Sequence, residues 1–260
     1  MALPLPSGLV PTEVAFLCEM EIITIVPRQR LESIPMLSGK TPALRPPRRA
    51  DLPLWLALLL KKQRRANIVP PPWLLTASLQ ELVNLETNVN PEGFSEPPPP
   101  PMRSDGRGVA RPYAATTSRT GDEDGDTKEL TLSSPFLPSC TQDAPSGYLP
   151  FHWLEIAETL LAHAADDIPN APEVRALLRD LQEVRAAKLR ASTRHLEGGG
   201  GVLKLRGVGA MELAESRGFV LSVVDGVRKL GASIEAGRRE EELERREGRG
   251  GDESDDDMEL

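Results

Sequence analysis

The clearest pattern of apolar positions lies in the second half of the chain, where they recur at helical spacing. Apolar side chains follow one another at intervals of three and four residues over 153–164, which places them on one face of an α-helix. A second stripe runs over 174–189, after Asn170, a residue type favoured as a helix N-cap, and Glu173. The sequence therefore predicts two amphipathic helices, separated by a break at Pro169.

The first half of the chain predicts shorter elements. A helix is expected to begin at Pro11, and the β-branched run 22–26 predicts a strand. Asp51 suits the N-cap of a further helix whose apolar run starts at Leu54. Apolar spacing over 76–85 predicts another helix.

Composition separates two further segments from these parts. Residues 91–150 contain 11 prolines, and residues 232–260 carry 12 acidic and 5 basic side chains, which is most of the net charge of −8. Such segments bury too little apolar surface to offset the entropy of ordering them. We therefore expect disorder in both. Over 216–230, valines favour a strand locally while Ser216 and the basic end favour a helix, so this stretch stays open.

The predicted fold class is α+β, mostly α. A small β-rich N-terminal module is followed by a helical-bundle module, with a disordered insertion and a disordered tail. The predicted boundaries in chain order are 1–69 for the β-rich module, 70–94 for the first part of the helical module, 95–147 for the insertion, 148–231 for the main helical module and 232–260 for the charged tail.

Few residues carry a pattern typical of catalysis, cofactor binding or metal binding. The run 39–41 (Gly-Lys-Thr) matches the end of a phosphate-binding loop, but Ile34 stands where that loop needs glycine and Pro42 follows. Cys18 and Cys140 are the only cysteines and lack metal-binding spacing. We predict no enzyme activity, no cofactor and no metal site.

The chain also lacks the patterns of membrane or secreted proteins. No apolar run approaches 18 residues, and the N-terminus has no signal-peptide pattern. Two cysteines without a pairing pattern suit a reducing compartment. We expect a soluble intracellular protein with no membrane partner.

The two helical stripes offer more apolar surface than a small self-contained core needs, so we expect partner proteins to cover part of it. Charged positions on the second helix are candidates for ion pairs across or within that interface. The predicted interface residues are Trp153, Ile156, Leu160, Val174, Arg175, Leu178, Asp180, Leu181, Arg185 and Lys188.

One basic concentration lies between Arg45 and Arg65. A solvated helix end with a basic loop is the favoured interpretation, and a nucleic-acid or nuclear-import patch is the alternative. Trp55, the aromatic residue of this stretch, belongs to the apolar run of the predicted helix, so the basic residues have no aromatic partner for stacking on bases. Contact with DNA is therefore left open rather than predicted. The residues concerned are Arg48, Arg49, Lys61, Lys62, Arg64 and Arg65.

Several motifs, in this order, resemble the PSF-two subunits of the eukaryotic GINS complex. They are Glu13-Val-Ala-Phe-Leu17, Glu21-Ile-Ile-Thr-Ile-Val-Pro27, Leu52-Pro-Leu-Trp-Leu-Ala57, Pro71-Pro72-Trp73, His163-Ala-Ala-Asp-Asp-Ile-Pro169, Arg185-Ala-Ala-Lys-Leu-Arg190 and Met211-Glu212-Leu213. The resemblance covers about 11–93 and 149–230. The long insertion and the charged tail depart from family members of minimal length.

The resemblance implies a fold with the small β-rich module first and the helical module second. It also implies a non-catalytic scaffold subunit whose partners are the three other GINS subunits, the Mcm ring and the Cdc-forty-five protein. Together these would form the replicative helicase in the nucleus, for initiation and elongation of DNA replication, with ATP hydrolysis belonging to the Mcm ring. The alternative function is a basic DNA-contacting adaptor that uses the Arg45–Arg65 cluster.

Overall fold

The structure is a computed structural model that describes residues 8, 10–36, 39–99, 102–104, 110–112, 139–192 and 205–250. The chain divides into two compact units. The first contains residues 1–189 and 204–216, and the second contains 190–203 and 217–260. The long last helix begins in the first unit and continues into the second.

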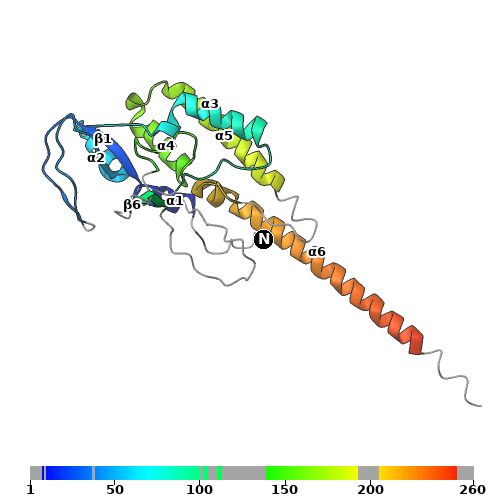
Figure 1. The fold of residues 1–260 in the computed structure, drawn as a ribbon. Helices are drawn as coiled ribbons and strands as arrows, with labels where there is room; N and C mark the ends of the chain where they lie inside the picture. Colours follow the sequence, from blue (N-terminus) through cyan, green and yellow to red (C-terminus); the bar gives the residue numbers. More distant parts are fainter. Residues whose placement is uncertain are drawn as a thin grey trace, which may run out of the picture. The chain divides into compact units, whose positions relative to one another are not determined.

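The first unit opens with a short helix and a three-stranded antiparallel sheet (Figure 1). The central strand is the predicted β-branched run, whose Ile23 and Ile25 are buried, and its neighbours pair with it in the order β4-β1-β5. The prediction of a strand here is confirmed. The elements are α1 (Pro11–Cys18), β1 (Ile22–Pro27), β4 (Ala50–Pro53), α2 (Leu54–Lys62) and β5 (Ala66–Ile68).

The sequence predicted that Asp51 caps α2, and this prediction is wrong. Asp51 lies inside β4. The pairing of β1 with β4 places Thr24 opposite Asp51, and the Thr24 hydroxyl donates to Asp51 Oδ1 over 2.6 Å. The Asp51 side chain therefore accepts a hydrogen bond from the neighbouring strand instead of capping the helix. The helix begins at Leu54, directly after Pro53.

The region between β1 and β4 contains a small antiparallel pair, β2 (Pro35–Met36) and β3 (Gly39–Lys40). Leu31 and Leu44 form a further bridge outside it. Lys40 thus lies in a strand of a hairpin and not before a helix N-terminus, which a phosphate-binding loop requires. This geometry agrees with excluding a nucleotide loop at 39–41.

The predicted helices over 76–85, 153–164 and 171–189 are all confirmed. The stretch 216–230, which the sequence left open, is helical, because it is part of α6. The remaining elements are η1 (Pro72–Leu74), α3 (Thr76–Asn84), η2 (Leu85–Val89), α4 (Trp153–His163), η3 (Ala165–Asp167), α5 (Ala171–Ser192) and α6 (Ala210–Gly250).

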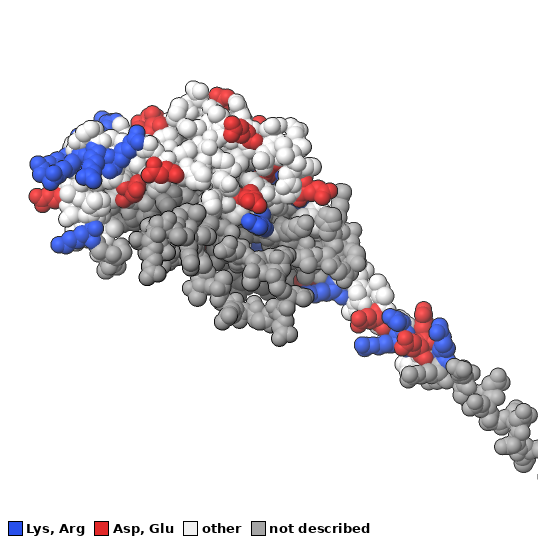
Figure 2. Space-filling view, viewed as in Figure 1, with Lys and Arg blue, Asp and Glu red and all other residues white. Residues whose placement is uncertain are grey.

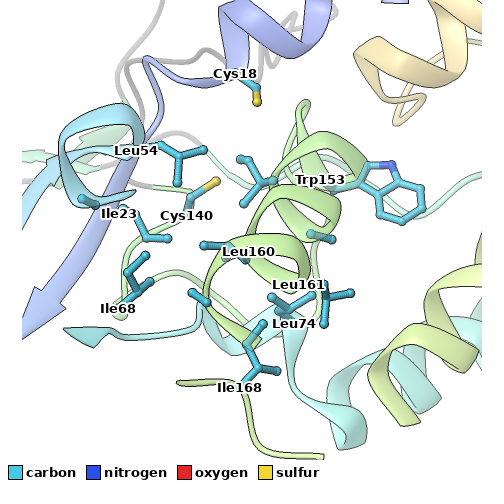
Figure 3. Close-up of a cluster of buried hydrophobic side chains, with 14 of the residues drawn as sticks. Cys18, Ile23, Leu54, Ile68, Leu74, Cys140, Trp153, Leu160, Leu161 and Ile168 are labelled. Atoms are coloured by element: carbon cyan, nitrogen blue, oxygen red, sulfur yellow. The ribbon is translucent and has the colours of Figure 1, made fainter. Parts of the chain in front are cut away.

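One hydrophobic core joins the sheet to the helices of the first unit (Figure 3). Ile23 and Leu54 from the sheet side share this core with Leu74, Trp153 and Leu160 from the helical side. All five side chains are at most 1% exposed. The β-rich and helical parts therefore pack as one body in this unit, although the sequence indicates two modules.

The predicted insertion is narrower than 95–147. Ser95 is buried, and Cys140 is completely buried within the core. The pair β6 (Met102–Ser104) and β7 (Ala110–Pro112) also falls within it. Composition averages over a window, so it cannot reveal that a few residues at each edge are held by contacts. Residues 113–138 lie outside the described part of the chain.

Much of the predicted disordered tail is helical, since α6 continues through 232 to Gly250. Residues 238–247 alternate short runs of arginine and glutamate, and Arg238 pairs with Glu242 at 3.6 Å, one helical turn away. Opposite charges at this spacing support a helix, whereas a charge count alone indicates disorder. Residues 251–260 lie outside the described part.

Candidate partner-binding surfaces

Most side chains predicted as a partner interface on α4 and α5 are buried by the first unit itself. Those in its interior are Trp153, Ile156, Leu160, Val174, Leu178, Leu181, Arg185 and Lys188. Arg175 and Asp180 are exposed. An apolar stripe in a sequence indicates that a helix face is buried, but it does not indicate which surface buries it. Here that surface belongs to the same chain. The eight buried side chains are therefore core residues rather than a free surface.

Arg185 is the centre of a buried ion-pair network, formed with Glu86, Lys188 and Glu212. Its guanidinium is fully buried, donates from Nε to Glu212 Oε1 over 2.7 Å and contacts Glu86 through Nη1. Burial lowers the pKa of this group, but the hydrogen bond to Glu212 and the attraction of both carboxylates raise it overall. Arg185 therefore stays charged inside the protein.

Lys188 lies one helical turn beyond Arg185 and extends the network. Its Nζ contacts Glu86 Oε2 at 3.3 Å and donates to the carbonyl oxygens of Asn90 and Gly93 over 2.8 and 2.6 Å. Burial lowers the pKa of Lys188, although Glu86 opposes that shift. The network thus ties the segment after η2 to α5.

Glu212 brings the beginning of α6 into the same network. The Gly209 N–H donates to Glu212 Oε2 over 2.7 Å, and the Trp153 indole N–H lies 3.3 Å from the same oxygen. A Cβ at position 209 would lie 2.8 Å from Trp153 Nε1, so only glycine fits there without a shift. The start of α6 is therefore fixed against α4 and α5.

The network was missed by the sequence analysis, but one signal for it exists. Arg185 and Lys188 continue the spacing of Val174, Leu178 and Leu181, so both lie on the buried row of α5 and not on its outer face. A charge on such a row indicates a buried partner. The partners, Glu86 and Glu212, are distant in sequence and no local pattern marks them.

Lys61 does not belong to the free basic surface with which it was grouped. Its Nζ lies 2.7 Å from both Asp166 Oδ2 and Asp167 Oδ2, and the latter oxygen also accepts the Ile68 N–H over 2.7 Å. These contacts link the end of α2 and β5 to η3. Burial lowers the pKa of Lys61, but its hydrogen bonds to the two aspartates raise it overall.

The other predicted basic residues gather at one end of the sheet, which we call the basic sheet end. Figure 2 shows Lys and Arg side chains concentrated at this part of the first unit. All are exposed. With Arg28, which follows β1, the set is Arg28, Arg48, Arg49, Lys62, Arg64 and Arg65.

A different part of the first unit exposes large apolar side chains on α1, on the turn that follows it and on α2. The Trp55 N–H donates to the carbonyl of Glu19 over 3.1 Å, so the beginning of α2 adjoins the end of α1. Phe16 is 70% exposed. This α1–α2 apolar surface consists of Phe16, Leu17, Met20, Trp55 and Leu59.

In the second unit, α6 also carries exposed apolar side chains. Leu230 and Ile234 lie one helical turn apart and are 66% and 72% exposed. Phe219 and Leu243 are exposed as well. Phe219, Leu230 and Ile234 share one face of the helix, whereas Leu243 lies on the other side. Since helix stability in proteins comes chiefly from packing of an apolar face, these three positions mark a face suited to a partner.

A buried cluster of acids and thiols lies between α1, β1 and the start of α4. Glu21 and Glu155 are nearly inaccessible, and each has one oxygen, Oε2, without a hydrogen-bond partner. His152 Nδ1 lies 3.0 Å from Glu155 Oε1. Burial, with a smaller effect of the Glu155 charge, raises the pKa of Glu21 to about 8. Glu21 is therefore largely protonated at neutral pH.

The thiols of this cluster are inert for a related reason. Burial and then the nearby carboxylates raise the pKa of Cys18 to about 12, and burial raises that of Cys140. A thiol without thiolate character is a poor nucleophile and metal ligand. Among the described residues, no three or more His, Cys, Asp or Glu side chains are placed to hold a metal ion. No described helix is long and apolar enough to span a membrane.

Comparisons with known proteins agree with this architecture. A family model described as the PSF2 N-terminal domain matches residues 10–69, and one described as the GINS complex protein helical bundle domain matches residues 117–231. The first match contains the sheet and α2, and the second contains α4, α5 and the start of α6.

Curated relatives match along nearly the whole chain. The chain is 66% identical over 237 residues to the DNA replication complex GINS protein PSF2 of Gibberella zeae, covering 90% of each. It is 61% identical over 273 residues to the psf2 protein of Neurospora crassa, covering 100% of each, and 33% identical over 233 residues to that of Schizosaccharomyces pombe, covering 88% of this chain and 96% of the relative. This chain therefore belongs to the PSF2 family of GINS complex subunits.

Proposed function

We propose that this chain is a non-catalytic scaffold subunit of a four-subunit GINS complex. In this proposal the complex joins the Mcm ring and the Cdc-forty-five protein in the replicative helicase, for initiation and elongation of replication in the nucleus. Family membership supports the assembly, since the relatives carry the name of a DNA replication complex protein. The three other GINS subunits are the direct partners expected.

The α1–α2 apolar surface is the observation that carries the proposal. Contiguous exposed apolar patches are uncommon on monomeric proteins and mark interaction sites. Phe16, Met20 and Trp55 supply the large side chains that form the buried centre of protein interfaces. Their burial by a partner would contribute about 25 cal/mol per Å² of apolar surface removed from water. These side chains are exposed in the single chain, and an interface with another subunit at this surface would bury them.

The second unit supports the same function independently. Its part of α6 presents Phe219, Leu230 and Ile234 without a covering surface among the described residues. A long helix with apolar positions left open suits packing against helices of other subunits. Assembly would therefore use two surfaces, one in each unit of the chain.

Co-expression with the three other GINS subunits tests the proposal. The chain should elute with them as one equimolar complex in gel filtration, with a tag on a different subunit. The double variant Phe16→Asp with Met20→Asp should lose incorporation, because an interface would bury two unpaired carboxylates. The control carries the same two added charges at Ala77 and Ala187, exposed positions of α3 and α5, and should assemble normally.

Two results would contradict these statements. Normal assembly of the Phe16/Met20 variant would remove the α1–α2 apolar surface as the contact while leaving the scaffold role standing. Elution of the wild-type chain as a monomer, with none of the co-expressed subunits, would overturn the scaffold role itself. Circular dichroism of the variant establishes that its fold is intact, as expected for changes at exposed positions.

A further inference from the structure

We propose that the basic sheet end binds the sugar-phosphate backbone of nucleic acid without reading base sequence. The site consists of Arg28, Arg48, Arg49, Lys62, Arg64 and Arg65. It goes beyond the scaffold role, because it assigns this chain a ligand that is not a protein subunit.

The register of the sheet brings three basic segments of the chain to one place. Arg48 and Arg49 directly precede β4, whose first residue pairs with Ile25 near the end of β1. Arg65 directly precedes β5, whose first residue pairs with Pro27 at the end of β1. Because both neighbours run antiparallel to β1, their beginnings meet its end.

Arg28 closes this arrangement from the central strand. It follows β1, and its N–H donates to the carbonyl of Arg65 over 2.7 Å. Neighbouring strands in a sheet are about 4.8 Å apart, so the fold holds the cations in a fixed row. A fixed array loses less entropy on binding than cations on a flexible segment.

These cations have no acidic partner among the described residues. No Asp or Glu of the described chain lies within ion-pair distance of any of the six. Asp51, the acid at the edge of the site, accepts the Thr24 hydroxyl. The Arg28 Nε donates to the Asn67 side chain over 2.8 Å, which leaves the terminal nitrogens of its guanidinium available. The hydrogen bond from Lys61 and, more weakly, the charge of Arg28 lower the pKa of Asp166, but that carboxylate is paired with Lys61. The six cations therefore leave the site with a net positive charge.

The absence of apolar side chains favours nucleic acid over an acidic protein as the ligand. No large apolar side chain is exposed in the described residues 21–36, 39–54 and 60–84, which include the site. Protein interfaces have an apolar centre around which charges form the rim. Phosphate backbones are bound by charge and hydrogen bonds, for which the arginine fork is suited. The exposed apolar side chains of α2, Trp55 and Leu59, belong to the α1–α2 apolar surface, which is assigned to protein partners.

The binding mode follows from the composition of the site. The site consists of arginine and lysine side chains alone, which bind phosphates of any base sequence, and it contributes no aromatic side chain to stack on bases. Affinity should therefore come from release of counterions and should fall steeply with salt. Duplexes of different sequence should bind equally well.

Fluorescence anisotropy of the full-length chain with a short labelled duplex of random sequence tests the proposal. The variant Arg48→Gln, Arg49→Gln, Arg65→Gln removes three cations from the basic sheet end. The matched control Arg238→Gln, Arg239→Gln, Arg245→Gln removes three exposed cations from α6, with the same change in net charge. Titration of each protein over a range of salt gives the affinity and its salt dependence.

We expect the wild type and the α6 control to bind with the same salt dependence. The sheet-end variant should bind at least tenfold more weakly at low salt, with a slope of log affinity against log salt shallower by about 2 to 3 units. Equal binding by all three proteins would overturn the proposal, as would wild-type binding that does not respond to salt.

Polyglutamate distinguishes the two kinds of polyanion. If the wild type bound polyglutamate and failed to bind the duplex, the ligand would be an acidic protein and the proposal would be wrong. Co-purification with the other subunits, measured separately, reports the scaffold role. Loss of assembly and loss of DNA binding can therefore be told apart.

Discussion

The buried ion-pair network and the basic sheet end both contain several cations, but those of the network stabilise the fold, whereas those of the sheet end are exposed to solvent. Arg185 is 1% exposed and is enclosed by carboxylates that keep it charged. Arg48 and Arg49 are exposed and have no described acidic partner. Residue type therefore does not assign the role of a cation. Its burial and its partners decide whether it stabilises the fold or meets a ligand.

The strongest test of this comparison removes the central cation of the network. Arg185→Met leaves Glu86 and Glu212 buried without their main partner, and breaking such a pair costs about 3–5 kcal/mol. We expect a loss of that size in the free energy of unfolding, measured by urea denaturation. Arg179→Met, an exposed position on the same helix, should change it by less than about 0.5 kcal/mol.

A smaller loss of stability is expected from adding a side chain at Gly209, where the network leaves no room for one. Gly209→Ala places a methyl group against Trp153 Nε1 and Glu212, and such overpacking costs about 1–3 kcal/mol. Gly226→Ala adds a methyl group where nothing lies within 4 Å. Because alanine is the better helix former, that variant should gain about 0.5–1 kcal/mol. Equal effects of the two changes in thermal unfolding would contradict the tight packing at Gly209.

The buried cluster of acids and thiols extends the comparison to an acid, Glu21, that is buried without a cation and stays largely protonated at neutral pH. Glu21 has a folded pKa of about 8 against an ordinary value of 4.5, so the unfolded chain loses this proton first as pH rises. Its contribution therefore makes stability fall between pH 4.5 and pH 8, by at most about 1.4 kcal/mol per pH unit. Glu21→Gln should be more stable than wild type at pH 7, and the difference should shrink toward pH 4.5. A constant difference across this range would contradict a buried neutral Glu21.

Adjacent lysines give the smallest and most direct contrast. Lys61 contacts Asp166 and Asp167, whereas Lys62 is exposed. Lys61→Met should cost about 1 kcal/mol, since one of its partners is exposed and screened, and Lys62→Met should be close to neutral. Thermal unfolding of the two variants provides the measurement. An equal loss from Lys62→Met would show that position in the basic run, rather than pairing, determines the effect.

Local patterns were sufficient for most elements of the fold. The β-branched run of β1 and the spacing of apolar residues in α3, α4 and α5 reflect forces within a few residues. Asp51 was assigned wrongly because its partner, Thr24, comes from another strand. The end of the ordered chain was placed too early because pairs such as Arg238 with Glu242 stabilise a helix that composition does not reveal.

The surfaces were harder to predict than the elements. The α4 and α5 stripes were expected to face partners, but their Leu160 and Leu181 lie in the chain's own core. Which apolar faces meet each other depends on tertiary contacts between residues far apart in sequence. For the same reason Lys61 could not be separated from Lys62, and the basic residues could not be placed on one sheet end.

The single core shared by the sheet and the helices has a consequence for the continuity of the chain. Residues up to Ser95 and residues from Cys140 onward are held together by side-chain packing and by the contacts of Arg185 with Glu86. We therefore expect this association to persist without the peptide connection between them. Two separately expressed fragments, 1–112 and 113–260, should therefore find each other and complement into one folded protein, as a split protein does.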